Sequence, residues 1–167
     1  MTITFAHLFR GFAALLVTAL AVGITAPEPA QACTLCTCSV TATNASFGTY
    51  NPTATAPTDT VGTVTVNCTG LVALLGSVEI AASAGSSGTV VQRTMQQGAN
   101  SLNYNLYVDP ARSILFGNGA GGSQTITRPL NGLLVFGQSV FYYGRIPARQ
   151  WVRAGSYTDS VIITVTY

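Results

Sequence analysis

Residues 154–167 read AGSYTDSVIITVTY, and the last seven of these residues are the strongest indicator of the fold. Apolar and polar positions alternate through them. The residues of one face are Val161, Ile163, Val165 and Tyr167. A period of two residues, with many β-branched side chains, predicts a half-buried β-strand. Because such a strand has an open edge unless another strand lies beside it, the stretch raises the question of what pairs with it.

Shorter segments with the same alternation precede this strand and are separated by glycine, proline and asparagine. The clearest is LNYNLYV at residues 102–108, where the pattern predicts that Leu102, Tyr104, Leu106 and Val108 face inward and Asn103, Asn105 and Tyr107 face outward. No stretch shows helical periodicity. Roughly six or seven strands separated by turns predict an all-β protein, an antiparallel β-sandwich of the immunoglobulin-like type.

The N-terminal region differs in composition from the rest. Arg10 is followed by the apolar run GFAALLVTALAVGI, and Ala30-Gln31-Ala32 stands just before Cys33. A basic start, a short apolar run and a small-residue site predict a cleavable signal peptide over residues 1–32. We therefore expect a short cysteine-rich segment at 33–37, a single domain at 38–167, and a secreted protein.

The charged residues argue against catalysis and against nucleic acid as a partner. The net charge is only +2, no lysine is present, and the single histidine, His7, lies in the expected signal peptide. The carboxylates after it are scattered among different segments, at Asp59, Glu79, Asp109 and Asp159. A histidine-based triad or metal site has no residues to build it, so we expect no enzyme activity, no cofactor and no metal.

Two glycine- or cysteine-rich motifs also have a structural interpretation. GNGAGG at residues 117–122 matches a dinucleotide-binding spacing, but a strand-like segment follows it, so Asn118-Gly119 predicts a turn. CTLCTC at residues 33–38 contains a C-x-x-C, which serves redox chemistry or zinc binding in other contexts. A strand rather than a helix follows here, which favours a disulfide or a free pair at the end of the domain.

The four cysteines allow three pairings in an oxidising compartment. Cys38 begins one alternating segment and Cys68 ends the next, each in phase with the apolar face of its own segment. This phase favours a disulfide between Cys38 and Cys68. Cys33 and Cys36 are then left to pair locally.

The segment YGRIPARQWVRAGSY, residues 143–157, has two interpretations. Arginine beside an exposed aromatic ring can bind carbohydrate or an anionic surface. The candidate residues are Arg145, Arg149, Trp151 and Arg153. The alternative is a solvated connection into the last strand, with Trp151 partly packed.

Several motifs together resemble the spore coat protein U domain family. They are SFGTYNP (46–52), GTVTVNCTG (62–70), SAGSSGT (83–89), LNYNLYVDPAR (102–112), GNGAGG (117–122) and YGRIPA followed by AGSYTDSVIITVTY. The resemblance covers nearly all of residues 38–167. That family is similar to the pilin subunits of archaic chaperone–usher pili, which implies a pilin-like sandwich of six strands that lacks its final strand.

The resemblance also implies a function and a set of partners. It implies a non-enzymatic structural subunit of a secreted pilus or coat that supports adhesion and biofilm, with a periplasmic chaperone, an outer-membrane usher and other pilin subunits as partners. It assigns Cys38 and Cys68 to the family's disulfide and residues 156–167 to the strand that the chaperone recognises. Val161, Ile163, Val165 and Tyr167 would line a groove filled by a neighbouring subunit's extension, which is donor-strand complementation.

One departure from the family pattern concerns the residues before Cys38. If the signal peptide ends at residue 32, only CTLCT precedes Cys38, which is short for a strand donated to a neighbour. We therefore expect a position at the fibre tip. The alternative function is a secreted carbohydrate- or surface-binding module that uses the arginine–tryptophan segment.

Overall fold

The computed structural model describes residues 36–70, 76–130 and 135–167, which form eight strands and one 3-10 helix. The strands are β1 (Cys36–Ala42), β2 (Thr58–Gly70), β3 (Gly76–Ala82), β4 (Arg93–Gln97), β5 (Asn100–Tyr107), β6 (Ile126–Leu130), β7 (Val135–Ile146) and β8 (Ile163–Thr166), and the 3-10 helix η1 is Gly85–Ser87. Within these ranges no helix is long and apolar enough to cross a membrane. The predicted signal peptide lies outside the described residues.

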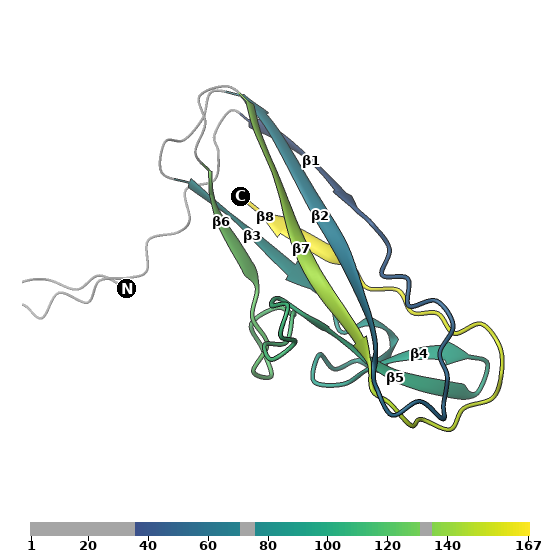
Figure 1. Ribbon diagram of the computed structural model, residues 1–167. Coiled ribbons are helices and arrows are strands. Elements are labelled where there is room, and N and C mark those ends of the chain that lie inside the picture. Colours follow the sequence, from purple (N-terminus) through teal and green to yellow (C-terminus); the bar gives the residue numbers. More distant parts are fainter. Residues whose placement is uncertain (1–35, 71–75, 131–134) are drawn as a thin grey trace, which may run out of the picture.

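The strands form two antiparallel sheets that face each other (Figure 1). One sheet has the order β1-β2-β7-β5-β4, and the other has the order β6-β3-β8. The buried core between them is built from alternate residues of facing strands, such as Val64 and Val66 of β2 and Val78 and Ile80 of β3. The predicted all-β sandwich is confirmed.

The strand that sequence patterning missed is β4. Its sequence RTMQQ has no apolar alternation, and Arg93 is completely buried within it. The Arg93 guanidinium donates hydrogen bonds to the carbonyl oxygens of Ser83 and Phe116 and to Oδ1 of Asn105, at 2.6 to 3.0 Å. A buried cation requires such acceptors. Asn105 was predicted to face outward; that prediction is wrong, because its amide is buried to meet Arg93.

The glycine-rich stretch at residues 117–122 forms a turn, as predicted. Gly119, Gly121 and Gly122 all have positive φ angles, of 85°, 61° and 77°. Residues with a Cβ atom rarely adopt positive φ angles, so glycine is strongly favoured at these three positions.

The edge strand β1 is joined to β2 by a disulfide. Cys38 lies directly opposite Cys68 in the antiparallel register, and their Cα atoms are 4.0 Å apart. The predicted pair is therefore present. Cys33 lies outside the described residues, as does the side chain of Cys36, so their predicted local pairing remains a prediction.

The disulfide gives a first test of the fold. It closes a loop of 30 residues, which in the chain-entropy model stabilises the protein by roughly 3–4 kcal/mol. We expect the double variant C38A/C68A to lose about this much free energy of unfolding in urea. Reducing agent should lower the stability of the natural chain to that of the variant and leave the variant unchanged; an equal response of both proteins to reductant would contradict the assignment.

Candidate functional site

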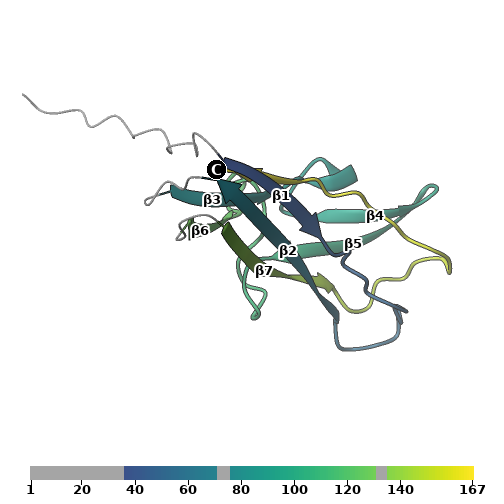
Figure 2. The ribbon, with the colours of Figure 1, turned by 90° about the horizontal axis from the view of Figure 1, so that it is seen from above.

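Each sheet presents an unpaired edge strand on the same side of the sandwich. Within the described ranges, β1 pairs only with β2, and β8 pairs only with β3. The view from above shows β1 and the chain leading into β8 along one side of the molecule (Figure 2). Unpaired edges leave backbone amide and carbonyl groups free to bond to another strand.

The inward face of β1 is exposed where the matching face of β2 is buried. Val40 lies directly opposite Val66 in the register, yet Val40 is 40% exposed and Val66 only 1%. Ala42 is likewise exposed opposite the fully buried Val64. Because paired residues in an antiparallel register share a face, these β1 side chains point toward the core but lack a cover.

The β8 edge shows the same pattern. Ile163 lies opposite Ala82 and Val165 opposite Ile80, and both β3 residues are 1% exposed. The predicted groove residues Val161, Ile163, Val165 and Tyr167 are all partly buried and pack against the core. The strand itself is shorter than the alternation from residue 161 predicts, because β8 begins at Ile163.

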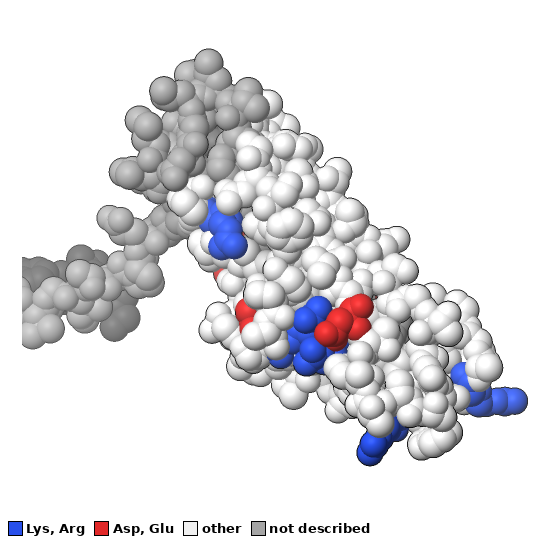
Figure 3. All heavy atoms as spheres, viewed as in Figure 1, with Lys and Arg blue, Asp and Glu red and all other residues white. Residues whose placement is uncertain are grey.

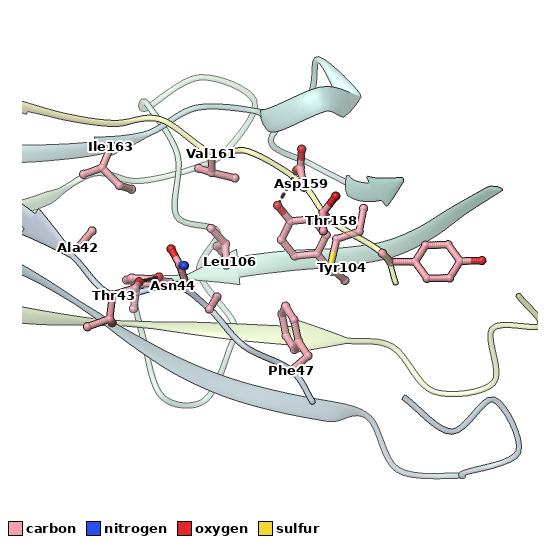
Figure 4. A pocket seen from close by; sticks show the side chains of 14 residues that line it. Ala42, Thr43, Asn44, Phe47, Tyr104, Leu106, Thr158, Asp159, Val161 and Ile163 are labelled. Atoms are coloured by element: carbon pink, nitrogen blue, oxygen red, sulfur yellow. Dashed lines mark hydrogen bonds between the residues drawn. The ribbon is translucent and has the colours of Figure 1, made fainter. Parts of the chain in front are cut away.

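A groove of two adjoining hollows begins where β1 ends and β8 begins, and it lies between residues 42–52 and the chain leading into β8. The first, of about 330 Å³, has Ala42, Thr43 and Asn44 on one side and Val161 and Ile163 on the other. Figure 4 shows these side chains facing each other across the floor formed by Leu106 and Tyr104. The second hollow is larger, about 810 Å³. Both hollows are lined by Asn44, Ala45, Phe47, Met95 and Tyr157, so they are continuous.

The structure brings together more groove residues than the sequence predicted. Val161 and Ile163 line the first hollow, while Val165 and Tyr167 do not line either hollow. The opposite wall, residues 42–52, was not predicted as part of the site. The sequence did contain a signal for this wall, because the motif SFGTYNP places two aromatic residues, Phe47 and Tyr50, in an otherwise polar stretch. In the structure both residues pack against the core.

One carboxylate lies in the wall of this groove, whose lining mixes apolar and polar residues. Asp159 Oδ2 accepts a hydrogen bond of 2.6 Å from the Tyr104 hydroxyl, and Oδ1 accepts bonds of 2.8 Å from the backbone amides of Ser86 and Ser160. Burial raises the pKa of Asp159, but the hydrogen bonds from Tyr104 and Ser86 outweigh it, so the pKa lies below its ordinary value. Burial and the Asp159 carboxylate together raise the pKa of Tyr104.

The predicted surface-binding residues do not form one cluster. Arg145 lies on β7, where its Nε donates a 2.7 Å hydrogen bond to Asp59, which Arg112 also approaches at 3.4 Å. This bond is the main reason that the pKa of Asp59 is lowered. Arg149, Trp151 and Arg153 lie together in the connection between β7 and β8 and are all exposed.

Comparisons with known proteins identify the family. The model of the Spore Coat Protein U domain matches residues 24–164. The chain belongs to this family. It is also 35% identical over 135 residues to Protein U of Myxococcus xanthus, covering 72% of this chain and 70% of that protein.

A solved structure is similar to this spore coat protein U domain in fold. It is the CsuC–CsuE chaperone–tip adhesion subunit pre-assembly complex from the archaic chaperone–usher Csu pili of Acinetobacter baumannii. The TM-score is 0.54 at 18% sequence identity, and the match covers 80% of this chain but only 40% of the other. The likeness establishes a shared β-sandwich fold.

The Asp159 hydrogen bonds give a pH-dependent prediction for this domain. A carboxyl group whose pKa is lowered in the folded state adds stability above its unfolded pKa of about 3.9, and that stability is lost as the pH falls through the folded pKa. We expect D159N to be less stable than the natural chain at pH 7, by about 1.5–3 kcal/mol for the lost charged hydrogen bonds. The gap should narrow below about pH 4.

Urea denaturation at a series of pH values measures this gap. E79Q is the matched control, because Glu79 is exposed and accepts one side-chain hydrogen bond, from Thr125. A gap between D159N and the natural chain that stays constant from pH 7 to pH 3 would show that the Asp159 charge does not stabilise the groove wall.

Proposed function

We propose that this protein is a structural subunit of a chaperone–usher type pilus or surface coat, and that a β-strand from another chain fills its groove. Membership of the spore coat protein U domain family supports a coat or pilus subunit. The fold shared with a pilus chaperone–subunit complex supports the same class. The proposed partners are a periplasmic chaperone, an outer-membrane usher and other subunits, and the proposed location is the cell surface.

The single observation that carries the proposal is the uncovered inward face of the two edge strands, β1 and β8. Val40 is 40% exposed beside a buried Val66, and Ile163 is partly exposed beside a buried Ala82. A strand inserted here would bond to free backbone groups of β1 and β8. It would also cover apolar side chains, at about 25 cal/mol for each Å² removed from water.

The disulfide is consistent with the proposed route through an oxidising compartment. Cys38 and Cys68 fix the edge strand β1 to β2. Disulfides form and persist in the periplasm and outside the cell. Fixing β1 in this way would hold one wall of the groove in place before a strand enters it.

Expression with and without a cognate chaperone tests the proposal. In the cell, the chain alone exposes apolar side chains along two open edges, so we expect most of it to aggregate or be degraded, and to accumulate as a soluble complex when the chaperone is present. The measurement is the amount of soluble, disulfide-bonded chain after size-exclusion chromatography. A soluble and stable monomer without any chaperone would contradict the proposed function.

Matched pairs of lysine substitutions distinguish the inward faces of the two edge strands from their outward faces. V40K and I163K place a charge on the inward faces of the β1 and β8 edges, whereas T41K and I162K place the same charge on neighbouring residues that face away. We expect the first pair to reduce assembly into fibres or chaperone complexes by at least about tenfold, because an incoming strand would bury the charge. The second pair should assemble normally.

The degree of folding is checked for each variant by formation of the disulfide. Val40 is already substantially exposed, so we expect the V40K variant to fold. If folded V40K and folded I163K assemble as well as T41K and I162K, the inward faces of these two edges are not the assembly site.

The position within the fibre is a further part of the proposal. The short segment before Cys38 that follows from the predicted signal peptide favours the tip over the shaft. Antibody labelling of isolated fibres should then mark one end of each fibre. Labels distributed along the shafts would refute the tip position without affecting the proposed assembly.

A further inference from the structure

The connection between β7 and β8 is held firmly at its first half by side-chain hydrogen bonds. The Tyr50 hydroxyl donates to the carbonyl of Pro147 at 3.0 Å and accepts from the backbone amide of Gln150 at 2.7 Å. The Gln150 side chain bonds to both the amide and the carbonyl of Asn103, each at 2.9 Å. These contacts fix the loop to the segment before β2 and to β5.

The second half of the connection is held as well. The Tyr157 hydroxyl donates to the carbonyl of Arg153 at 2.9 Å, and the Gln97 side chain donates to the carbonyl of Ala154 at 3.3 Å. Val152 packs against the core. The backbone between residues 147 and 157 is therefore anchored from several sides, which reduces the entropy that a ligand would otherwise have to remove on binding.

This anchored loop presents an exposed row of three side chains. Arg149, Trp151 and Arg153 are exposed, while Gln150 and Val152 between them are partly buried. Trp151 is 78% exposed, more than any other exposed large apolar side chain of the described residues. Arg149 has a φ of 61°, a conformation uncommon for residues other than glycine. We call these three residues the Arg–Trp–Arg row.

No carboxylate neutralises the row within the described ranges. The salt bridges there join Asp59 to Arg112 and Arg145, and neither Arg149 nor Arg153 takes part in one. Arginine side chains protrude from the end of the molecule where this connection lies, with no acidic side chain visible beside them (Figure 3). Along the chain, an exposed indole stands between two arginines without a salt bridge, and such a combination is complementary to a ring-containing anion.

We propose that the Arg–Trp–Arg row binds an acidic polysaccharide. The indole face of Trp151 would stack on the C–H face of a sugar ring. Arg149 and Arg153 are four residues apart, so they can reach carboxylate or sulfate groups up to roughly 14 Å apart along the polymer. Guanidinium groups bind such anions through paired hydrogen bonds.

The same residues fit other anionic partners less well. One tryptophan, with no second exposed large apolar side chain in the connection, offers little area for insertion into a membrane interface. Two arginines displace too few counterions for strong binding to nucleic acid. A polysaccharide needs only the stacking ring and the two charges that the row supplies.

The inference adds an attachment target to the proposed function and is tested separately from it. Arg153 also borders the wider hollow of the groove. Assembly is therefore measured for every variant alongside polysaccharide binding. Loss of polysaccharide binding with normal assembly would support the role of the Arg–Trp–Arg row. Aggregation that no chaperone prevents would count against the proposed function of the groove and not against the row.

The test measures how the full chain, purified in the soluble form that cells accumulate, binds three polymers. Two are anionic, alginate and dextran sulfate, and one is neutral, dextran. We expect binding to the two anionic polymers and none to dextran. W151A should weaken binding about tenfold through loss of stacking, and R149Q/R153Q at least about tenfold through loss of the charged hydrogen bonds.

Two variants elsewhere on the surface are the matched controls. R128Q removes another exposed arginine, and F141A removes another exposed aromatic side chain, which is 57% exposed. Both should bind within about twofold of the natural chain. Equal binding to dextran, no binding to either anionic polymer, or an equal loss in R128Q would overturn the inference. Binding to phosphatidylglycerol vesicles but not to alginate or dextran sulfate would also overturn it.

Discussion

Between the edges of β1 and β8, a strip of inward-facing side chains is left uncovered, and this strip is the main physical constraint on the domain. The side chains of both edges point toward the apolar interior, yet Val40 is 40% exposed while its register partner Val66 is buried. Burying one such valine, leucine or isoleucine is worth about 1.5–3 kcal/mol. A domain that leaves several of them uncovered gains stability from any strand that enters. The same strip exposes the isolated chain to aggregation.

Polar contacts stabilise the sandwich around this strip. The disulfide between Cys38 and Cys68 ties the β1 edge to the five-stranded sheet. On the other side, Asp159 ties the chain leading into β8 to Tyr104 of β5 and to Ser86 of η1. The buried Arg93 joins β4 to β5 and to the end of β3 through neutral acceptors. These bonds position the walls without filling the groove.

Two surfaces of this domain therefore have different physical characters. The groove has a mixed lining of apolar and polar residues beside two open backbone edges, and it suits an extended strand. The Arg–Trp–Arg row is solvated, cationic and anchored by hydrogen bonds to Tyr50 and Asn103. In the proposed functions, the groove would join the subunit to its own assembly and the row would bind a polysaccharide outside the cell. The two surfaces adjoin at Arg153, at the border of the wider hollow.

Alternation along the sequence predicted the fold class and favoured the Cys38–Cys68 pair, because a period of two residues assigns each side chain to a face. The groove residues of the last strand were implied by the family resemblance instead, and of these Val161 and Ile163 line the first hollow. Only the tertiary structure decided the opposite wall at residues 42–52, the β4 strand and the separation of Arg145 from Arg149 and Arg153. Those features depend on contacts between distant segments: Arg93 is buried because Ser83, Asn105 and Phe116 supply acceptors, and no periodicity along the chain encodes such a meeting.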